Sequence, residues 1–296
     1  MFGLLSCIGV NIGTIGCLGV EDRQRDRIAF YDSTRELLEL YQWDGTDFSK
    51  INSGMSIPGS TKPAMCALND TDIVLFDVAD DDLNIYRWAT SKWYQKYQDD
   101  NTVSESGWPT ITALSKNEIA FLGGGNNYIR FLRFDGESWS QVGNALNITS
   151  ILIPSITALS GTSIALVKSV THRLYKYSFD GTDWSLVGNS LDLVDIGSSA
   201  VAALDDSTVA YVDDTNKLLS TYEFDGTDWA LVGNALSMGA SMSSPCLTAV
   251  NETDVIYYDS DNELLKYYEW DGSDWSQVGN SLSIPSVGNP AIAFLK

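Results

Sequence analysis

The stretch FDGTDWSLVGNSL, residues 179–191, returns 45 residues later as FDGTDWALVGNAL and again as WDGSDWSQVGNSL from Trp270. Related turns begin at Trp43, Trp88 and Phe134, so the copies are spaced by 45 or 46 residues. A second marker, an alanine before an apolar residue, repeats at Ala67, Ala113, Ala158, Ala203, Ala249 and Ala293. Two markers with one period indicate six structural repeats.

Each repeat contains four short runs that are typical of β-strands. In the fifth repeat the runs are residues 200–204, 208–213, 217–224 and 228–233. They are rich in Val, Tyr, Leu and Trp, and no segment keeps a helical period over ten residues. The Asp-Gly pair lies between the third and fourth runs, where glycine supplies the positive φ of a tight turn. The phrase therefore predicts a hairpin, and we expect Trp184, Trp229 and Trp275 to pack between repeats.

The two ends of the chain complement one another. The C-terminal NPAIAFLK supplies a single first strand, whereas DRIAFYDS (26–33) matches a second strand and leads into a third and a fourth. We therefore expect Ala291–Leu295 to pair with Ile28–Tyr31. A unit built from one C-terminal and three N-terminal strands closes a ring and leaves no exposed sheet edge. The sequence predicts an all-β fold, a six-bladed β-propeller over residues 26–296.

The repeat, written [FW]DG[TS]DW...VGN[SA]L, resembles the blades of β-propeller repeat proteins. These include structural or attachment proteins of phages and other viruses, bacterial surface proteins and some propeller lectins. The resemblance covers residues 26–296 and matches no single protein. It implies a rigid platform, and such a platform serves binding, structural and enzymatic roles alike.

Charge and cysteine content exclude several kinds of partner. The chain has 39 acidic and 18 basic residues and a formal net charge of −21. It therefore repels nucleic-acid phosphates and anionic lipids, and we expect neither nucleic acid nor membrane as a partner. Four cysteines without a CxxC pair and a single histidine, His172, indicate no zinc site. Cys66 and Cys246 are expected to be unpaired because another blade separates them.

Residues that break the repeat are the candidates for a functional site. Trp108 is the one tryptophan of nine outside the hairpins, and it lies in the long insertion 98–109. It is a candidate anchor for a sugar or a partner chain, or else a plug for the central channel.

The turns between second and third strands also differ among repeats. Four are acidic, namely 32–36, 77–82, 213–217 and 259–263, whereas 123–127 reads GGGNN and 168–173 reads KSVTHR. The non-acidic pair predicts a patch for a carboxylate or a sugar, with ordinary solvated turns as the alternative. Its candidate residues are Asn126, Asn127, Lys168, His172 and Arg173. We expect no cofactor; calcium at the acidic turns is a weaker alternative, because no turn has the spacing of an EF-hand.

The first 20 residues belong to no repeat and carry no charged side chain. They lack the basic start of a secretory signal, and five glycines make them a poor membrane helix. Their alternation places Ile8, Val10 and Ile12 on one side of a strand. We expect this N-terminal arm (residues 1–25) to dock on another chain, with packing on its own propeller or membrane insertion as alternatives.

Three functions are compatible with these patterns. The first is a non-enzymatic structural or attachment module with protein partners, such as a virion or tail protein, located on a virion or outside the cell. The second is a lectin that binds glycans at up to six sites built from the repeated aromatics. The third is a propeller hydrolase, which needs an acid, a base or a nucleophile at one end of the channel. With a single histidine, the hydrolase ranks last.

Overall fold

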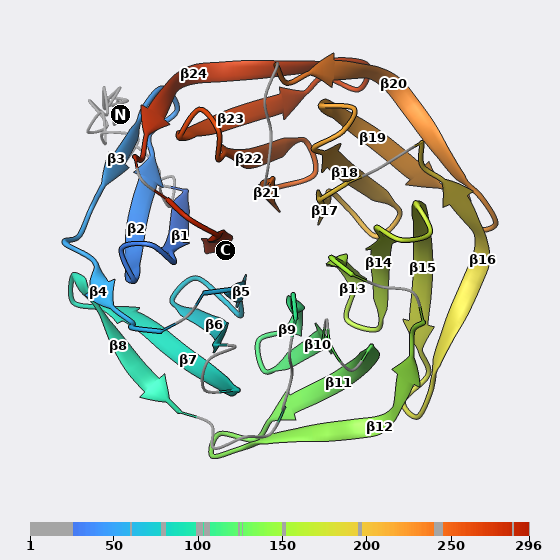
Figure 1. Ribbon diagram of the computed structural model, residues 1–296, viewed down its shortest axis with the longest axis horizontal. Coiled ribbons are helices and arrows are strands. Elements are labelled where there is room, and N and C mark those ends of the chain that lie inside the picture. Colours follow the sequence, from blue (N-terminus) through green and yellow to red (C-terminus); the bar gives the residue numbers. More distant parts are fainter. Residues whose placement is uncertain are drawn as a thin grey trace, which may run out of the picture.

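The computed structural model describes residues 26–59, 61–77, 81–98, 103, 107–123, 125, 127–149, 152–194, 197–239, 245–285 and 287–295. They form six antiparallel sheets around a central axis, so the chain is a six-bladed β-propeller, as predicted (Figure 1). Every regular element in this part of the chain is a strand, and it contains no helix that could cross a membrane.

The blades are numbered in chain order, and the strands of each blade are given from the innermost, next to the axis, to the outermost. Blade 1 consists of β25 (Pro290–Leu295), β1 (Arg27–Asp32), β2 (Leu37–Trp43) and β3 (Phe48–Lys50), with β4 (Met55–Ser56) also pairing with β2. Blade 2 consists of β5 (Ala64–Ala67), β6 (Asp72–Asp77), β7 (Asp82–Ala89) and β8 (Lys92–Tyr97). Blade 3 consists of β9 (Thr110–Ser115), β10 (Glu118–Leu122), β11 (Tyr128–Phe134) and β12 (Trp139–Asn147).

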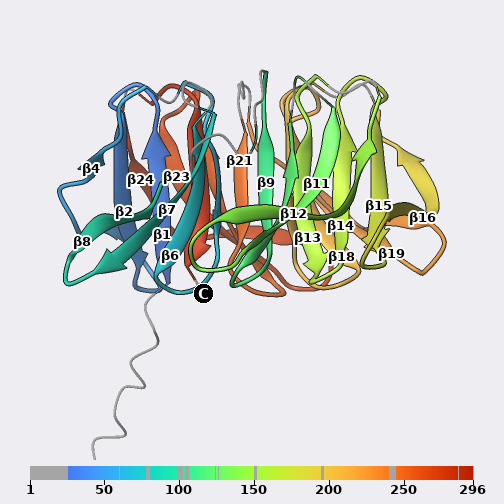
Figure 2. The ribbon, with the colours of Figure 1, turned by 90° about the horizontal axis from the view of Figure 1, so that it is seen from below.

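The remaining three blades repeat this order. Blade 4 consists of β13 (Ser155–Ser160), β14 (Ser163–Lys168), β15 (Arg173–Phe179) and β16 (Trp184–Asp192). Blade 5 consists of β17 (Ser199–Ala203), β18 (Thr208–Asp213), β19 (Leu218–Phe224) and β20 (Trp229–Ser237). Blade 6 consists of β21 (Cys246–Ala249), β22 (Asp254–Asp259), β23 (Leu264–Trp270) and β24 (Trp275–Ser283). The innermost strands begin at one face, called the upper face, which is at the top of Figure 2. The repeated Asp-Gly turns lie on the opposite, lower face.

Blade 1 closes the ring as the sequence predicts. β25 pairs with β1 so that Phe294 lies opposite Ile28 and Ala291 lies opposite Tyr31. The register corrects one of the sequence markers. Ala67 of blade 2 lies opposite Ile73, the residue equivalent to Ile28, so Phe294 and not Ala293 holds the alanine position in blade 1. The marker in blade 1 was therefore one residue too early. Phe294 is the one aromatic side chain among the six equivalent positions that line the channel.

The hydrophobic core is divided into clusters that lie between adjacent blades. Trp229 of blade 5 packs with Val167 of blade 4, and Trp275 of blade 6 packs with Val212 of blade 5. Trp184 packs in the same way against blade 3. The three indoles are only 4–5% exposed, which confirms that they lie between blades. They therefore present no face to a ligand.

The VGN part of the repeated phrase joins blades 3, 4, 5 and 6 to the blade that follows, and we call the contact between two adjacent blades at the perimeter a joint. Gly188 has a φ of +63°, and a Cβ added there would lie 2.3 Å from the carbonyl oxygen of Thr227. Only glycine permits this approach. The backbone N–H of Asn189 donates to that oxygen at 2.7 Å, and its side-chain amide donates to Asp228 Oδ1 at 2.9 Å. The same hydrogen bond, from an asparagine side-chain amide to an aspartate Oδ1, recurs in Asn144–Asp183, Asn234–Asp274 and Asn280–Asp47.

These joints also explain why the outermost strands are longer than the sequence analysis predicts. In blade 5 the predicted run ends at residue 233, whereas β20 continues to Ser237. The register of its pairing with β19 shifts between Leu219 and Thr221, as in a β-bulge, and then resumes. β12, β16, β20 and β24 thus reach the next blade along the perimeter of the ring (Figure 1).

The two joints on either side of blade 2 are different. Its hairpin, WATSKW, lacks the Asp-Gly turn, and β8 ends at Tyr97 without a VGN sequence. The described residues show no amide-to-carboxylate bond of the repeated kind at either joint. Packing of Tyr97 on Phe134, with ring centroids 4.9 Å apart, holds blade 2 to blade 3. Blade 2 thus lacks the amide-to-carboxylate bond on both sides, and the hydrophobic clusters that it shares with blades 1 and 3 hold it in the ring.

The two cysteines in the described residues are unpaired. Cys66 lies on β5 and Cys246 on β21, with β25 of blade 1 between these strands, as expected. Burial raises the pKa of the Cys66 thiol and raises that of Cys246 to about 12. Both thiols are thus held in the unreactive protonated form at neutral pH.

The Asp-Gly turns should make the fold sensitive to acid. Asp180 Oδ1 accepts backbone N–H bonds from Thr182 and Asp183, both at 2.8 Å, and these bonds lower the pKa of the carboxyl. The same holds for Asp135, Asp225 and Asp271. A lowered pKa stabilises the fold above the usual aspartate pKa of about 3.9, and this stability is lost as pH falls through the lower folded value.

We expect the melting temperature of a variant with asparagine at these four positions to fall less steeply between pH 5 and pH 2.5 than that of the parent protein. Asparagine keeps the Oδ1 acceptor but does not titrate. Thermal denaturation followed by circular dichroism gives the two slopes. Equal slopes would show that the turns contribute nothing to acid sensitivity.

Candidate binding site at the upper channel mouth

A ring of prolines surrounds the channel at the upper face. Five innermost strands have proline at the same position, namely Pro63, Pro109, Pro154, Pro245 and Pro290. Proline suits the edge of a strand, where no ladder hydrogen bond needs its missing N–H group. In blade 5 the position is taken by Ser199, which lines the same channel segment.

Trp108 lies at this mouth. It helps to line a cavity of about 150 Å³ to which residues of all six blades contribute, among them Pro63, Ile153, Ser199 and Asn289. Its ring is half-buried, and the Lys62 ammonium lies 5.1 Å from the ring centroid. The structure thus brings the one tryptophan outside the hairpins to the axis of the ring.

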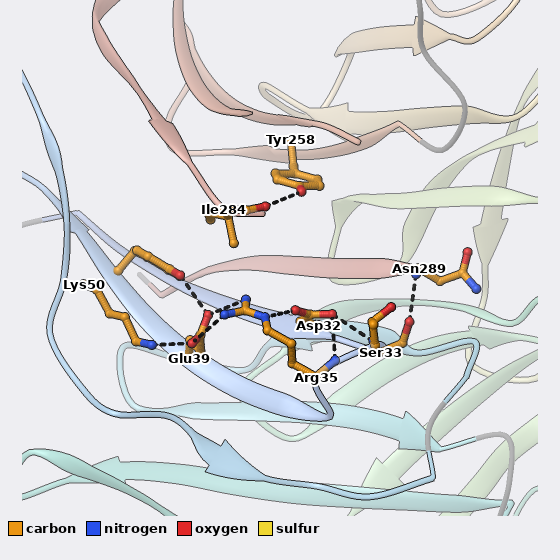
Figure 3. Close-up of polar contacts among 10 residues, drawn as sticks. Asp32, Ser33, Arg35, Glu39, Lys50, Tyr258, Ile284 and Asn289 are labelled. Carbon is orange, nitrogen blue, oxygen red and sulfur yellow. Dashed lines mark hydrogen bonds and ion pairs between the residues drawn. The ribbon is translucent and has the colours of Figure 1, made fainter. Parts of the chain in front are cut away.

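Two polar residues share the mouth with Trp108. Ser199 is 8% exposed, and no described residue bonds to its Oγ. The side-chain amide of Asn289 donates to the Thr61 carbonyl oxygen at 2.8 Å, and its backbone N–H donates to Ser33 Oγ at 2.8 Å (Figure 3). The sequence analysis missed both residues. The signal for Ser199 was present, because it replaces the proline of the other five blades.

The structure does not combine the predicted patch residues into one pocket. Lys168 is buried under the Tyr175 ring and donates to the Thr149 carbonyl oxygen at 3.4 Å, and burial lowers the pKa of its ammonium. Arg173 pairs with Asp192 at 2.5 Å. No hydrogen bond or ion pair joins these cations to each other or to Asn127 in the described part of the chain.

The other patch residues have separate environments. Asn127 and His172 occupy turn positions with φ of +61° and +53°. Asn127 Oδ1 is buried without a described partner, and the His172 carbonyl oxygen accepts the Leu193 N–H at 2.7 Å. Asn126 and the arm residues Ile8, Val10 and Ile12 lie outside the described residues.

Exposed apolar side chains surround the same upper turn of blade 4. Leu152, Val170 and Val194 are 63%, 53% and 78% exposed, and we call them the apolar strip. They are neighbours because the Ile153 N–H donates to Ser169 Oγ at 3.1 Å, and Leu193 bonds to His172. Sequence reasoning noted this turn for its charge and overlooked Val170, whose equivalents in blades 1, 5 and 6 are Thr34, Thr215 and Asp261.

The carboxylates of the acidic turns are engaged within the protein. Asp32 Oδ1 accepts the Thr34 N–H at 2.9 Å, and Asp213 Oδ1 accepts the Asn216 N–H at 2.7 Å. Buried Glu39 pairs with Arg35 at 2.9 Å and also with Lys50 (Figure 3). The described residues include no group of three or more His, Cys, Asp or Glu side chains placed to hold a metal ion.

No protein-family model and no curated protein matches the chain. Solved structures do. A nidogen–laminin complex matches with a TM-score of 0.66 and 11% identity, covering 92% of this chain and 98% of the other. A mutant of Aleuria aurantia lectin in complex with Fucα1-6GlcNAc matches with a TM-score of 0.58 and 12% identity, covering 89% and 97%.

A Bacteroides uniformis protein provisionally assigned as a 6-phosphogluconolactonase is also similar. It matches with a TM-score of 0.67 and 10% identity, covering 92% of this chain and 99% of the other. At such low identity all three likenesses show the fold alone. Because the three proteins differ in what their names describe, the likenesses do not choose among binding, assembly and catalysis.

Proposed function

We propose that the chain is a non-enzymatic attachment module of a larger assembly, and that its upper face holds a partner protein. The apolar strip carries this proposal. Five of the six large apolar side chains that are exposed among the described residues belong to blades 4 and 5 or their linkers, and three of them form the strip. A soluble, strongly acidic chain that gathers exposed apolar groups at one turn has the composition of an interaction surface.

The fate of the acidic groups supports a non-enzymatic role. Asp32, Asp213 and Glu39 are buried and already bonded to turn amides or cations. A general acid or base needs a group that can exchange a proton with a substrate. These carboxylates stabilise the turns and blade 1 instead.

The assembly that we propose is a virion or a phage tail, which also sets the expected location outside the cell. The support is the resemblance of the repeat to viral structural propellers. In this proposal the arm, with Ile8, Val10 and Ile12, tethers the ring to a neighbouring chain. The apolar, uncharged arm can add as a strand to an exposed sheet edge of a neighbouring chain, and this is why we favour a second chain as the acceptor.

Site-specific photo-crosslinking tests the attachment proposal. A photoreactive p-benzoylphenylalanine in place of Val170 or Val194 should capture the same protein in the particles or cells that contain the chain. Glu252, exposed on the lower face, is the matched control position and should capture nothing specific. A variant with aspartate at both strip positions should release the partner while the ring stays folded. Identical products from the two faces, or none from the strip, would contradict the proposal.

Carbohydrate binding is the second candidate function, and one observation favours it. Trp108 and Ser199 line one cavity at the mouth, and the buried Ser199 hydroxyl has no partner among the described residues. The six-site lectin of the sequence analysis gains no such support, because the repeated tryptophans are buried between blades. A lectin of this chain would therefore use the axis of the ring.

A further inference from the structure

We infer that the upper mouth of the channel binds a single sugar ring at the end of a glycan. This inference deepens carbohydrate binding, the second candidate function, and it rests on that candidate and not on a partner protein at the apolar strip. It assigns a ligand class to Trp108, Ser199 and Asn289, which line one cavity.

The size of the cavity fits one ring. Its volume is about 150 Å³. Apolar protein cavities of about 150 Å³ accept a six-membered ring such as benzene. A pyranose is larger because of its hydroxyl groups, so some of these would remain outside the cavity. The prolines of the mouth and Ile153 make the walls rigid and mostly apolar, as in sites for small ligands. A longer glycan would extend from the mouth into solvent.

Trp108 supplies a flat surface for such a ring. An indole face packs against apolar C–H groups, and Trp combines large area with little side-chain freedom. One face of a pyranose offers several C–H groups in a plane. Lys62 lies 5.1 Å from the ring centroid and limits how a ligand can approach.

The polar groups at the mouth favour a sugar over an apolar side chain from a partner protein. Ser199 Oγ is buried and lacks a described partner, and burying a hydroxyl without a hydrogen bond is costly. An inserted leucine or valine would leave it unpaired, whereas a sugar hydroxyl would bond to it once rotation about the Ser199 Cα–Cβ bond turned Oγ toward the cavity. Asn289, held in place through Thr61 and Ser33, adds a second polar group to the lining of the cavity.

The charge at the mouth further limits the ligand. The described lining includes no carboxylate, although the chain as a whole has 39 acidic residues. The Lys62 ammonium lies against the Trp108 ring. The site therefore suits a neutral or acidic sugar. Because residues of all six blades line this cavity on the axis, each propeller should bind one sugar rather than six.

The test begins with a glycan array on the full chain and continues with titration calorimetry of the best-bound saccharide. We expect a stoichiometry of one. Trp108→Ala should weaken binding by at least about tenfold, and Ser199→Ala by about fivefold, the loss of one hydrogen bond. Trp108→Phe should retain part of the affinity. Leu186→Gln is the matched control, since blades 3 and 6 have glutamine at this exposed position, and it should bind as the parent does.

Two outcomes would overturn the sugar site. One is an array on which no glycan binds the folded protein. The other is binding with several sugars per ring that Trp108→Ala leaves unchanged. The crosslinking experiment at Val170 and Val194 is independent of both outcomes. If a partner is captured there and no glycan on the array binds, the sugar site is refuted and the attachment function stands. If a sugar binds and no partner is captured, the attachment function is refuted and the sugar site stands.

Discussion

Removing residues 290–296 is expected to abolish cooperative folding of the ring. β25 pairs with β1 over its full length, and the truncation would expose that edge along the whole of blade 1. It would also delete Ile292 and Leu295, which are 7% and 4% exposed, and each such side chain contributes about 1.5–3 kcal/mol when buried. Together with the lost ladder bonds, this approaches the total stability of about 5–15 kcal/mol that is typical of a domain.

Thermal denaturation and size-exclusion chromatography of the truncated protein measure this loss. The matched control is removal of residues 1–20, which we expect to leave the melting temperature nearly unchanged while it prevents assembly. If the protein without β25 melted at the temperature of the full chain, closure by the two chain ends would be wrong.

Most of the fold could be predicted because the repeats leave a regular signal in the sequence. The Asp-Gly pair marks a turn by its own chemistry, and the spacing of its copies counts the blades. The complementary ends predicted that Ala291–Leu295 pairs with Ile28–Tyr31, and the strand pairing confirms it. The bulge at Gly233 could not be predicted, because its glycine is required by the carbonyl oxygen of Ser273 in the next blade and not by its own strand.

The site was harder to predict for a related reason. Trp108 stood out because it departs from the repeat, but its place at the axis depends on how the ring closes. Lys168 looked like a surface cation, yet the Tyr175 ring and the Thr149 carbonyl oxygen enclose it. Ser199 carried a readable signal as the one residue that replaces a proline. Only the packing of six blades shows that its hydroxyl is buried.

Two tryptophans have different roles: Trp229 stabilises the fold, whereas Trp108 binds the ligand. Trp229 is 4% exposed in the cluster between blades 4 and 5. Replacing a buried tryptophan by alanine costs about 3–5 kcal/mol, which lowers the melting temperature of a large domain by roughly 10 °C. Trp108 is half-buried at the channel mouth, outside the core clusters, and its loss should leave the melting temperature within about 2 °C of the parent value.

The most direct measurement is a paired comparison of Trp229→Ala and Trp108→Ala by thermal denaturation and by binding to the glycan array. Trp229→Ala should melt roughly 10 °C lower and, below that transition, bind as the parent does. Trp108→Ala should melt as the parent does and bind the glycan at least about tenfold more weakly. The reverse pattern, in which Trp108→Ala unfolds the ring or Trp229→Ala alone abolishes binding in a folded protein, would contradict the assignment of structure to the repeats and function to their exceptions.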